Sequence, residues 1–218
     1  MEQIRSCRVA SFYVDPLAPY RCPKVSRTVF LARHGSHAEV GQILSGRSDI
    51  GLSERGRAEA RRLADRLQDV PLARIFSSPR RRTRETASIV AERHDCDVES
   101  ADALDEIDFG AWTGRTFAEL APDPDWRGWN EARATAATPA GDTMAAATRR
   151  AVDHIQSIEE SGPVLCVSHC DIIRGVAAHY LGLSHDRLLA FDCDPASLSA
   201  LALDGDRGRV VTLNERPA

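Results

Sequence analysis

Long apolar runs are missing from this chain. None approaches the roughly 20 residues that a membrane-spanning helix needs, and the N-terminal stretch MEQIRSCRVASFYVDP lacks the continuous apolar segment of a signal peptide. We therefore expect a soluble, cytoplasmic protein with no membrane partner. Lysine is nearly absent too, since Lys24 is the only one, and the net charge is −4. A mildly acidic chain is not typical of general nucleic-acid binders, so we expect no nucleic-acid partner.

The six cysteines form no C-x-x-C pair. The usual ligand spacing of a zinc site is absent, and a chain of this size without an export signal does not predict a disulfide framework. Cysteine-dependent phosphatases place an arginine six positions after the cysteine, whereas Arg174 follows Cys170 by four positions and Cys166 by eight. These spacings argue against a metal site and a cysteine nucleophile, and we expect no metal and no cofactor.

Strand and helix patterns do alternate along most of the chain. Its 218 residues and 43% hydrophobic content fit one domain. Residues 1–27 contain three prolines, and their apolar residues show no sustained helical or strand spacing. We therefore expect an irregular N-terminal extension to a domain at 28–218. The strands are expected in TVFLAR, ARIFSS, DCDVES and GPVLCVSH, with SLSALAL and RVVTLN flanking a hairpin at DGDRG. This alternation predicts an α/β fold with a mostly parallel sheet.

The intervening helices are expected in SERGRAEARRLADRLQDV, in RRRTRETASIVAERH, at residues 142–160 and in DIIRGVAAHYLGL. The first three place apolar residues on one helical face, and the fourth is expected to end near Gly182. Ser53 is a candidate N-cap for the first of them, because its oxygen can accept a hydrogen bond from an otherwise unpaired helix N–H.

Polar residues follow three of the expected strands. The first strand stops at Arg33, His34 and Gly35, the second runs into SSPRRRTRETA, and a later one ends at VSHCD, which contains His169. Ligands of such sheets bind beyond the carboxyl ends of the strands. Any one of these segments could be a plain strand-to-helix turn. The three together, with LDEIDFGAWTG, indicate a functional site.

At these segments the sequence resembles the histidine phosphatase superfamily, also called phosphoglycerate mutase-like. The resemblance covers residues 28 to about 214 and rests on five blocks in order: LARHG, SGRSDIGLSERGRAEARRLADRL, FSSPRRRTRETASIVA, LDEIDFGAWTG and VLCVSHCDIIRG. It implies a three-layer α/β/α sandwich and an enzyme of the histidine acid phosphatase type, a phosphoric monoester hydrolase.

The resemblance implies a role for each of five residues. His34 would be the nucleophile that forms a phosphohistidine, with the Gly35 carbonyl fixing its tautomer. Arg33, Arg82 and His169 would form the phosphate pocket, because fixed positive donors stabilise the charge of a transferring phosphoryl group. Glu106 would protonate the leaving oxygen and then activate water.

Two assignments require a choice between neighbours. Arg82 matches the family pattern because it precedes a small residue and lies four before Thr86, so the nearby arginines Arg80, Arg81 and Arg84 are expected on a solvated helix face. Alignment to the Leu-x-Glu block favours Glu106, which leaves Asp105 and Asp108 as polar loop residues.

Several departures from the family pattern concern the substrate. Cys170 stands where glycine is usual, and only its backbone N–H is expected to face phosphate. Ser45 and Gly46 correspond to positions that can touch the substrate phosphate. His37 could contact substrate, but we expect a surface histidine. GSHAEV lacks the threonine and asparagine of mutase-like members, which weakens a mutase assignment.

The segment after Glu106 holds all three tryptophans, Trp112, Trp126 and Trp129. They could cover an organic leaving group, and we expect at least two of them to pack a lid instead.

Three functions remain open at this point. The first is a metal-independent phosphomonoesterase that hydrolyses a small phosphorylated metabolite through phospho-His34. The second is a cofactor-dependent phosphoglycerate mutase-type phosphoryl transfer, and the third is a non-catalytic phosphate-binding protein on the same fold. The last is disfavoured because binding alone needs no acid. The chain is expected to be a monomer or a homodimer.

Overall fold

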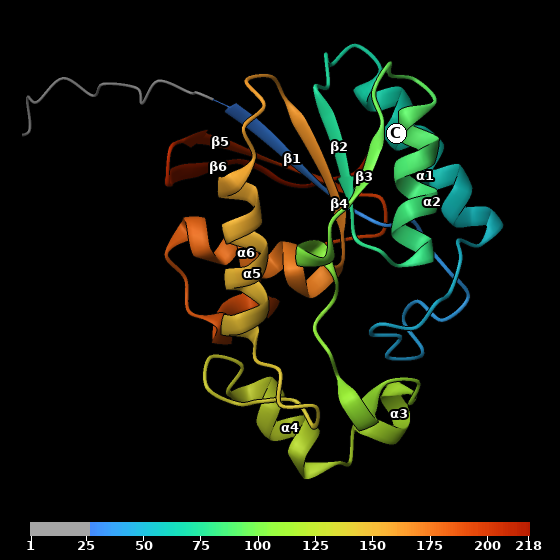
Figure 1. Ribbon diagram of the computed structural model, residues 1–218. Coiled ribbons are helices and arrows are strands. Elements are labelled where there is room, and N and C mark those ends of the chain that lie inside the picture. The colour runs from blue at the N-terminus through green and yellow to red at the C-terminus, as the bar shows by residue number, and fades with distance from the viewer. Residues whose placement is uncertain (1–26) are drawn as a thin grey trace, which may run out of the picture.

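The computed structural model describes residues 27–218, so the predicted N-terminal extension lies outside the described residues except for Arg27, which begins the first strand. Six strands form one sheet in the order β3-β2-β4-β1-β5-β6 (Figure 1). The parallel strands are β1 (Arg27–Arg33), β2 (Arg74–Ser77), β3 (Val98–Ser100) and β4 (Val164–Ser168). The hairpin of β5 (Leu198–Asp204) and β6 (Arg207–Glu215) pairs antiparallel with β1.

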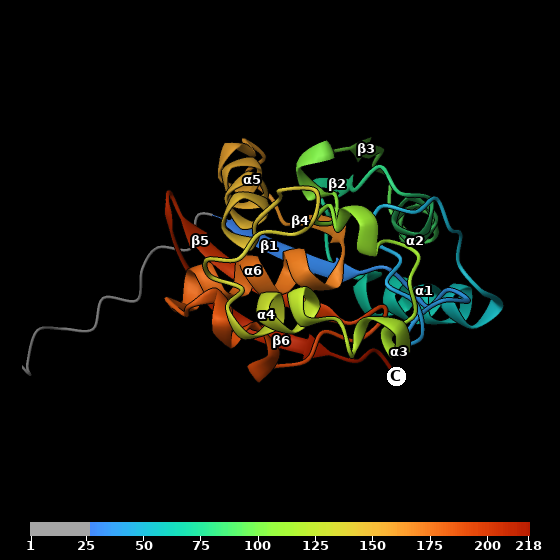
Figure 2. The ribbon, with the colours of Figure 1, turned by 90° about the horizontal axis from the view of Figure 1, so that it is seen from below.

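Four long helices cover the sheet: α1 (Glu54–Leu67), α2 (Arg81–Ala91), α5 (Met144–Ser157) and α6 (Cys170–Leu181). Figure 2 shows α1 and α2 on one side of the sheet and α5 on the other. Successive residues of a strand face opposite sides. Leu165 and Val167 of β4 accordingly pack with α1 and α2, whereas Val164 and Cys166 pack with α5 and α6. The predicted three-layer α/β/α sandwich is confirmed.

Local sequence signals place the helix ends. Ser53 is the N-cap of α1, where its Oγ accepts a hydrogen bond from the Gly56 amide at 3.1 Å, as predicted. Helix α6 stops at Gly182, whose left-handed φ of +66° suits glycine. Within residues 27–218 the structure contains no helix with the length and apolarity needed to cross a membrane.

A small cap lies beyond the carboxyl ends of the parallel strands (Figure 1). It consists of α3 (Phe117–Leu120) and α4 (Pro124–Glu131), with the 3-10 turns η1 (Asp102–Leu104) and η2 (Gly110–Trp112) leading into it. A further 3-10 segment, η3 (His185–Ala190), follows α6. Trp112 and Trp129 are buried within the cap, which confirms that two tryptophans pack it, while Trp126 is only partly buried.

Candidate active site

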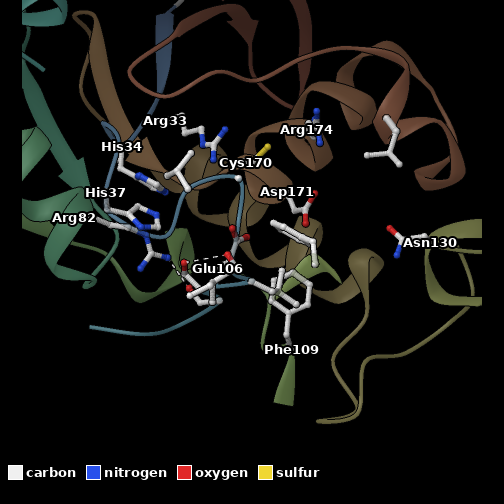
Figure 3. Close-up of a pocket in the computed structure, with 18 of the residues that line it drawn as sticks. Arg33, His34, His37, Arg82, Glu106, Phe109, Asn130, Cys170, Asp171 and Arg174 are labelled. Atoms are coloured by element: carbon white, nitrogen blue, oxygen red, sulfur yellow. Dashed lines mark hydrogen bonds between the residues drawn. The ribbon is translucent and has the colours of Figure 1, made fainter. Parts of the chain in front are cut away.

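A cavity of about 310 Å³ opens where β1 and β4 end, under the cap. It is within the size range of pockets for small metabolites. Most of the residues predicted for the site line it: Arg33, His34, Arg82, Glu106, Ser45, Gly46 and Cys170 (Figure 3). His169 is the exception. It is fully buried behind the cavity wall, with its ring centroid 5.3 Å from that of His34.

His34 leaves the end of β1 with its ring fixed. Its Nδ1 lies 2.8 Å from the Gly35 carbonyl oxygen, which can only accept a hydrogen bond, so Nδ1 carries the proton. Nε2 is then the unprotonated nitrogen. The Gly35 amide donates to Thr86 Oγ1 at 3.1 Å, and a Cβ on Gly35 would collide with the backbone of Gly56. Glycine is therefore required beside His34, and the predicted Gly35 carbonyl contact is present.

The cavity favours neutral histidines. Burial lowers the pKa of His34 well below its usual value, and the Arg82 and Arg33 guanidinium groups lower it further. The same three causes bring the pKa of His37 to about 4. At neutral pH the positive charge of the inner cavity therefore resides on arginines, and the His34 ring is unprotonated at Nε2.

Contrary to the prediction, His37 does not lie on the surface. Its side chain turns into the cavity, the residue is 7% exposed, and its ring centroid lies 5.2 Å from that of His34. The turn is held by Glu59 of α1, which accepts hydrogen bonds from the amide and the hydroxyl of Ser36 at 2.8 and 3.0 Å. The prediction was wrong because Glu59 is distant in sequence and gave no signal of this contact.

Two of the arginines that line the cavity, Arg33 and Arg82, are anchored by backbone carbonyls. Arg82 donates from Nη1 to the Ser48 carbonyl at 2.8 Å and from Nη2 to the Gly46 carbonyl at 2.5 Å. Arg33 donates from Nη1 to the Cys193 carbonyl at 2.6 Å. Among residues 27–218, neither Nε has a hydrogen-bond partner although both are buried. Buried donors without partners are costly. Both residues also line the cavity, where their guanidinium charge favours an anion.

Behind the cavity, His169 belongs to a hydrogen-bonded chain. Its Nδ1 accepts from Arg82 Nη2 at 3.0 Å, and its Nε2 lies 2.7 Å from Ser78 Oγ. Ser78 in turn donates to Asp105 at 3.2 Å. Both ring nitrogens of His169 are thus engaged with protein groups, and the residue orients Arg82. Direct contact between His169 and a phosphate stays a prediction.

The structure contradicts the predictions for Asp105 and Arg80. Asp105 is buried rather than a polar loop residue, and Arg80 turns toward it rather than joining a solvated face. The Arg80 Nε and Nη2 atoms lie 2.9 and 2.6 Å from the two Asp105 oxygens. Asp105 also accepts from the Glu106 amide at 2.9 Å. The two residues are 25 positions apart in the chain, so the local sequence does not indicate that they pair. Arg81 and Arg84 are exposed on α2 as predicted.

Glu106 is a buried carboxyl in the wall of the cavity. It is 8% exposed and lines the cavity opposite Arg82 (Figure 3). Burial raises its pKa well above the usual value, and the negative charges of Asp171 and Cys170 add to that effect. Such a carboxyl can hold a proton at neutral pH and donate it.

The outer cavity has a mixed wall. Its apolar side includes Phe117 and Trp126 of the cap, and its polar side includes Asn130, Asp171 and Arg174. Trp126 packs edge-on against Trp112, with ring centroids 5.3 Å apart. Of the three tryptophans, only Trp126 therefore borders the cavity.

Comparison with known proteins agrees with this geometry. The family model described as histidine phosphatase superfamily, branch 1, matches residues 29–216. The chain belongs to this superfamily. It is 31% identical over 193 residues to phosphoserine phosphatase 1 of Hydrogenobacter thermophilus, which covers 85% of this chain and 91% of the relative.

Other members differ in their named activities. The probable phosphoglycerate mutase GpmB of Erwinia tasmaniensis is 30% identical over 161 residues, or 71% of this chain and 75% of that protein. Mycobacterial glucosyl-3-phosphoglycerate phosphatase Rv2419c, solved in complex with VO3, superposes with a TM-score of 0.78 at 30% identity, over 87% of this chain and 99% of that one. The comparisons thus show the fold and the superfamily of this chain. The named activities differ among the relatives, so the comparisons do not identify its substrate.

Proposed function

We propose that this chain is a metal-independent phosphomonoesterase that hydrolyses a small phosphorylated metabolite through a phosphohistidine on His34. The observation that carries the proposal is the state of the His34 ring. Its Nδ1 is bonded to the Gly35 carbonyl, and its pKa is lowered by burial and by two arginines. Nε2 therefore presents an electron pair to the cavity at neutral pH, as a nucleophile must.

In the first step, Nε2 of His34 attacks phosphorus while the bond to the leaving oxygen breaks. Protonated Glu106 gives its proton to that oxygen, and the alcohol departs. Arg33 and Arg82 hold the equatorial phosphoryl oxygens, whose charge they stabilise. In this proposal the backbone at Gly46 and Cys170 and the Ser45 hydroxyl add substrate contacts around the same oxygens.

In the second step, water attacks the phosphohistidine. The Glu106 carboxylate takes a proton from that water, the bond from phosphorus to Nε2 breaks, and phosphate leaves. Glu106 is again protonated and His34 is again neutral. The raised pKa of Glu106 suits the acid of the first step.

The test uses phosphate release from a generic aryl phosphate with EDTA present, with wild type, His34→Ala and His37→Ala compared. His37 is a matched control because it is a second buried histidine in the same cavity. Activity in wild type that disappears in His34→Ala and persists in His37→Ala supports the proposal. Full activity in His34→Ala would overturn it.

Two further measurements separate the alternative functions. A mutase would show activity on 3-phosphoglycerate that requires a bisphosphate primer. A non-catalytic binding protein would bind inorganic phosphate and turn over no member of a broad substrate panel.

A further inference from the structure

Two cysteine thiols meet at the edge of the cavity, and the proposed phosphoryl transfer uses neither of them. Cys170 is the first residue of α6, and Cys193 precedes β5. Cys170 Sγ lies 3.7 Å from the Cys193 carbonyl oxygen, and the Cys193 side chain is close enough to lower the pKa of the Cys170 thiol. Figure 3 shows the Cys170 sulfur next to Arg33.

The two cysteines differ in access. Cys170 is partly exposed and lines the cavity, so a small reagent can reach its sulfur through the cavity mouth. Cys193 is 5% exposed and lies behind it. A reagent entering the cavity therefore meets Cys170 first, with Cys193 as its immediate neighbour.

The surroundings of Cys170 favour the thiolate. The sulfur is on the first residue of a 12-residue helix, where the helix dipole stabilises negative charge. A hydrogen bond from the Cys193 thiol and the nearby Arg33 guanidinium bring the pKa of Cys170 to about 7. Burial instead raises the pKa of Cys96, and it raises that of Cys166 to about 12.

We propose that Cys170 is an oxidation site for hydroperoxides and that Cys193 resolves the product as a disulfide. The Cys170 thiolate attacks the terminal peroxide oxygen, the O–O bond breaks, and the departing hydroxide or alkoxide takes a proton. Cys170 is then a sulfenic acid. The Cys193 sulfur attacks the Cys170 sulfur, the S–O bond breaks, and water leaves with the proton of the Cys193 thiol. The two cysteines have lost two electrons, and the peroxide has gained them.

The disulfide would change the proposed phosphate site. Its sulfurs must approach to about 2.05 Å, which draws the start of α6 toward the segment of Cys193. That segment anchors Arg33 through the Cys193 carbonyl, and the start of α6 borders the cavity at Cys170. Oxidation is therefore expected to weaken phosphate binding. This consequence rests on the proposed function, whereas the thiol chemistry does not.

The experiment treats the full-length protein with a small molar excess of hydrogen peroxide, blocks free thiols and analyses tryptic peptides by mass spectrometry. The expected product joins peptide 151–174 to peptide 188–207, and its mass is two hydrogen atoms below the sum of the two reduced peptides. Fragment ions separate Cys170 from Cys166, which shares the first peptide. Cys170 should be oxidised roughly tenfold faster than Cys96 because it is more often a thiolate.

Variants and activity give the second readout. Cys170→Gly and Cys193→Ala should not form the linked peptide, whereas Cys96→Ser, a control away from the cavity, should form it like wild type. Peroxide should abolish most phosphate release by wild type, and dithiothreitol should restore it. In Cys193→Ala, loss should become irreversible as Cys170 passes to sulfinic acid.

The proposal is overturned if folded wild type forms no link between Cys170 and Cys193, or if Cys170→Gly loses activity to peroxide as fast as wild type. If the untreated protein hydrolyses no phosphomonoester, the proposed function fails, and the linked peptide still decides the thiol proposal by itself.

Discussion

Replacing Glu106 by glutamine is expected to slow hydrolysis and, at the same time, to stabilise the folded protein. The two effects have one cause. Glu106 is a buried carboxyl whose pKa is raised by burial and by neighbouring negative charge. Glutamine has nearly the same shape, and its side-chain oxygen can still accept from the Ile107 amide as Glu106 does at 3.2 Å. The variant therefore removes the proton and the charge with little change in packing.

The kinetic effect depends on the leaving group. A general acid contributes about 10²–10⁴ in rate when the leaving oxygen needs a proton, so kcat for an alkyl phosphate should fall by that factor. An aryl phosphate with an acidic phenol leaves readily without a proton, and its phosphoryl-transfer step should fall much less. Burst kinetics with the aryl phosphate isolate that step from the later attack of water.

The stability effect has a definite sign. Because the folded pKa exceeds the unfolded pKa, the folded state of wild type holds the extra proton between the two values, and its stability falls as pH rises through that window. Glutamine does not titrate. Above the window, the variant should be more stable by at least about 1–3 kcal/mol, because burying an incompletely solvated polar group costs that much and a charged carboxylate costs more.

Urea unfolding of both proteins across the pH range measures this difference. The gain should vanish at acid pH, below the unfolded pKa of a carboxyl near 4.3. A variant that is less stable than wild type at alkaline pH, or equally slowed on alkyl and aryl phosphates in the first step, would refute the reasoning.

Three further predictions concern other residues of the site and the core. Asp105→Asn should lower the free energy of unfolding by about 1–3 kcal/mol in urea titrations, because the partly exposed Arg80 loses the charged partner that buried Asp105 provides; an unchanged midpoint would contradict this. After correction for the ionisation of the phosphate monoester, whose second pKa is about 6, the pH profile of kcat/KM should stay flat well below pH 6.5, because the pKa of His34 is lowered; a remaining acidic limb centred near 6.5 would show an imidazolium that titrates normally. Gly175→Ala should destabilise by about 1–3 kcal/mol because its Cβ would meet the Thr148 side chain, whereas Gly128→Ala, where a Cβ meets nothing within 4 Å, should match or exceed wild type in thermal unfolding.

The fold could be predicted because its signals are local. The apolar runs of β1 and β4, the amphipathic faces of α1 and α5, and the Ser53 cap are each visible within a few residues of sequence. The order of the strands in the sheet depends on contacts between distant segments and cannot be read from local sequence. The alternation of strands and helices nevertheless predicts that most of the strands are parallel.

The residues that the motifs single out for the candidate site lie around one cavity, whereas residues positioned by a partner far away in the chain differ from the prediction. His34, Arg82 and Glu106 lie together around one cavity as expected. The sequence predicts a polar loop position for Asp105 because the Leu-x-Glu block favours Glu106, whereas the pairing of Asp105 with Arg80 accompanies its burial. The sequence likewise predicts a surface position for His37, which lines the cavity instead. In each case the deciding contact joins segments that are far apart in the chain.

The central claim is tested most directly by trapping the covalent intermediate. Wild type is mixed with an aryl phosphate, quenched in alkali after milliseconds and digested with trypsin, which releases peptide 34–47 with both His34 and His37. The account predicts one added phosphoryl group on this peptide, located at His34 by fragment ions and absent from His34→Ala. A phosphoryl group on His37, or turnover with no labelled histidine at any quench time, would contradict it.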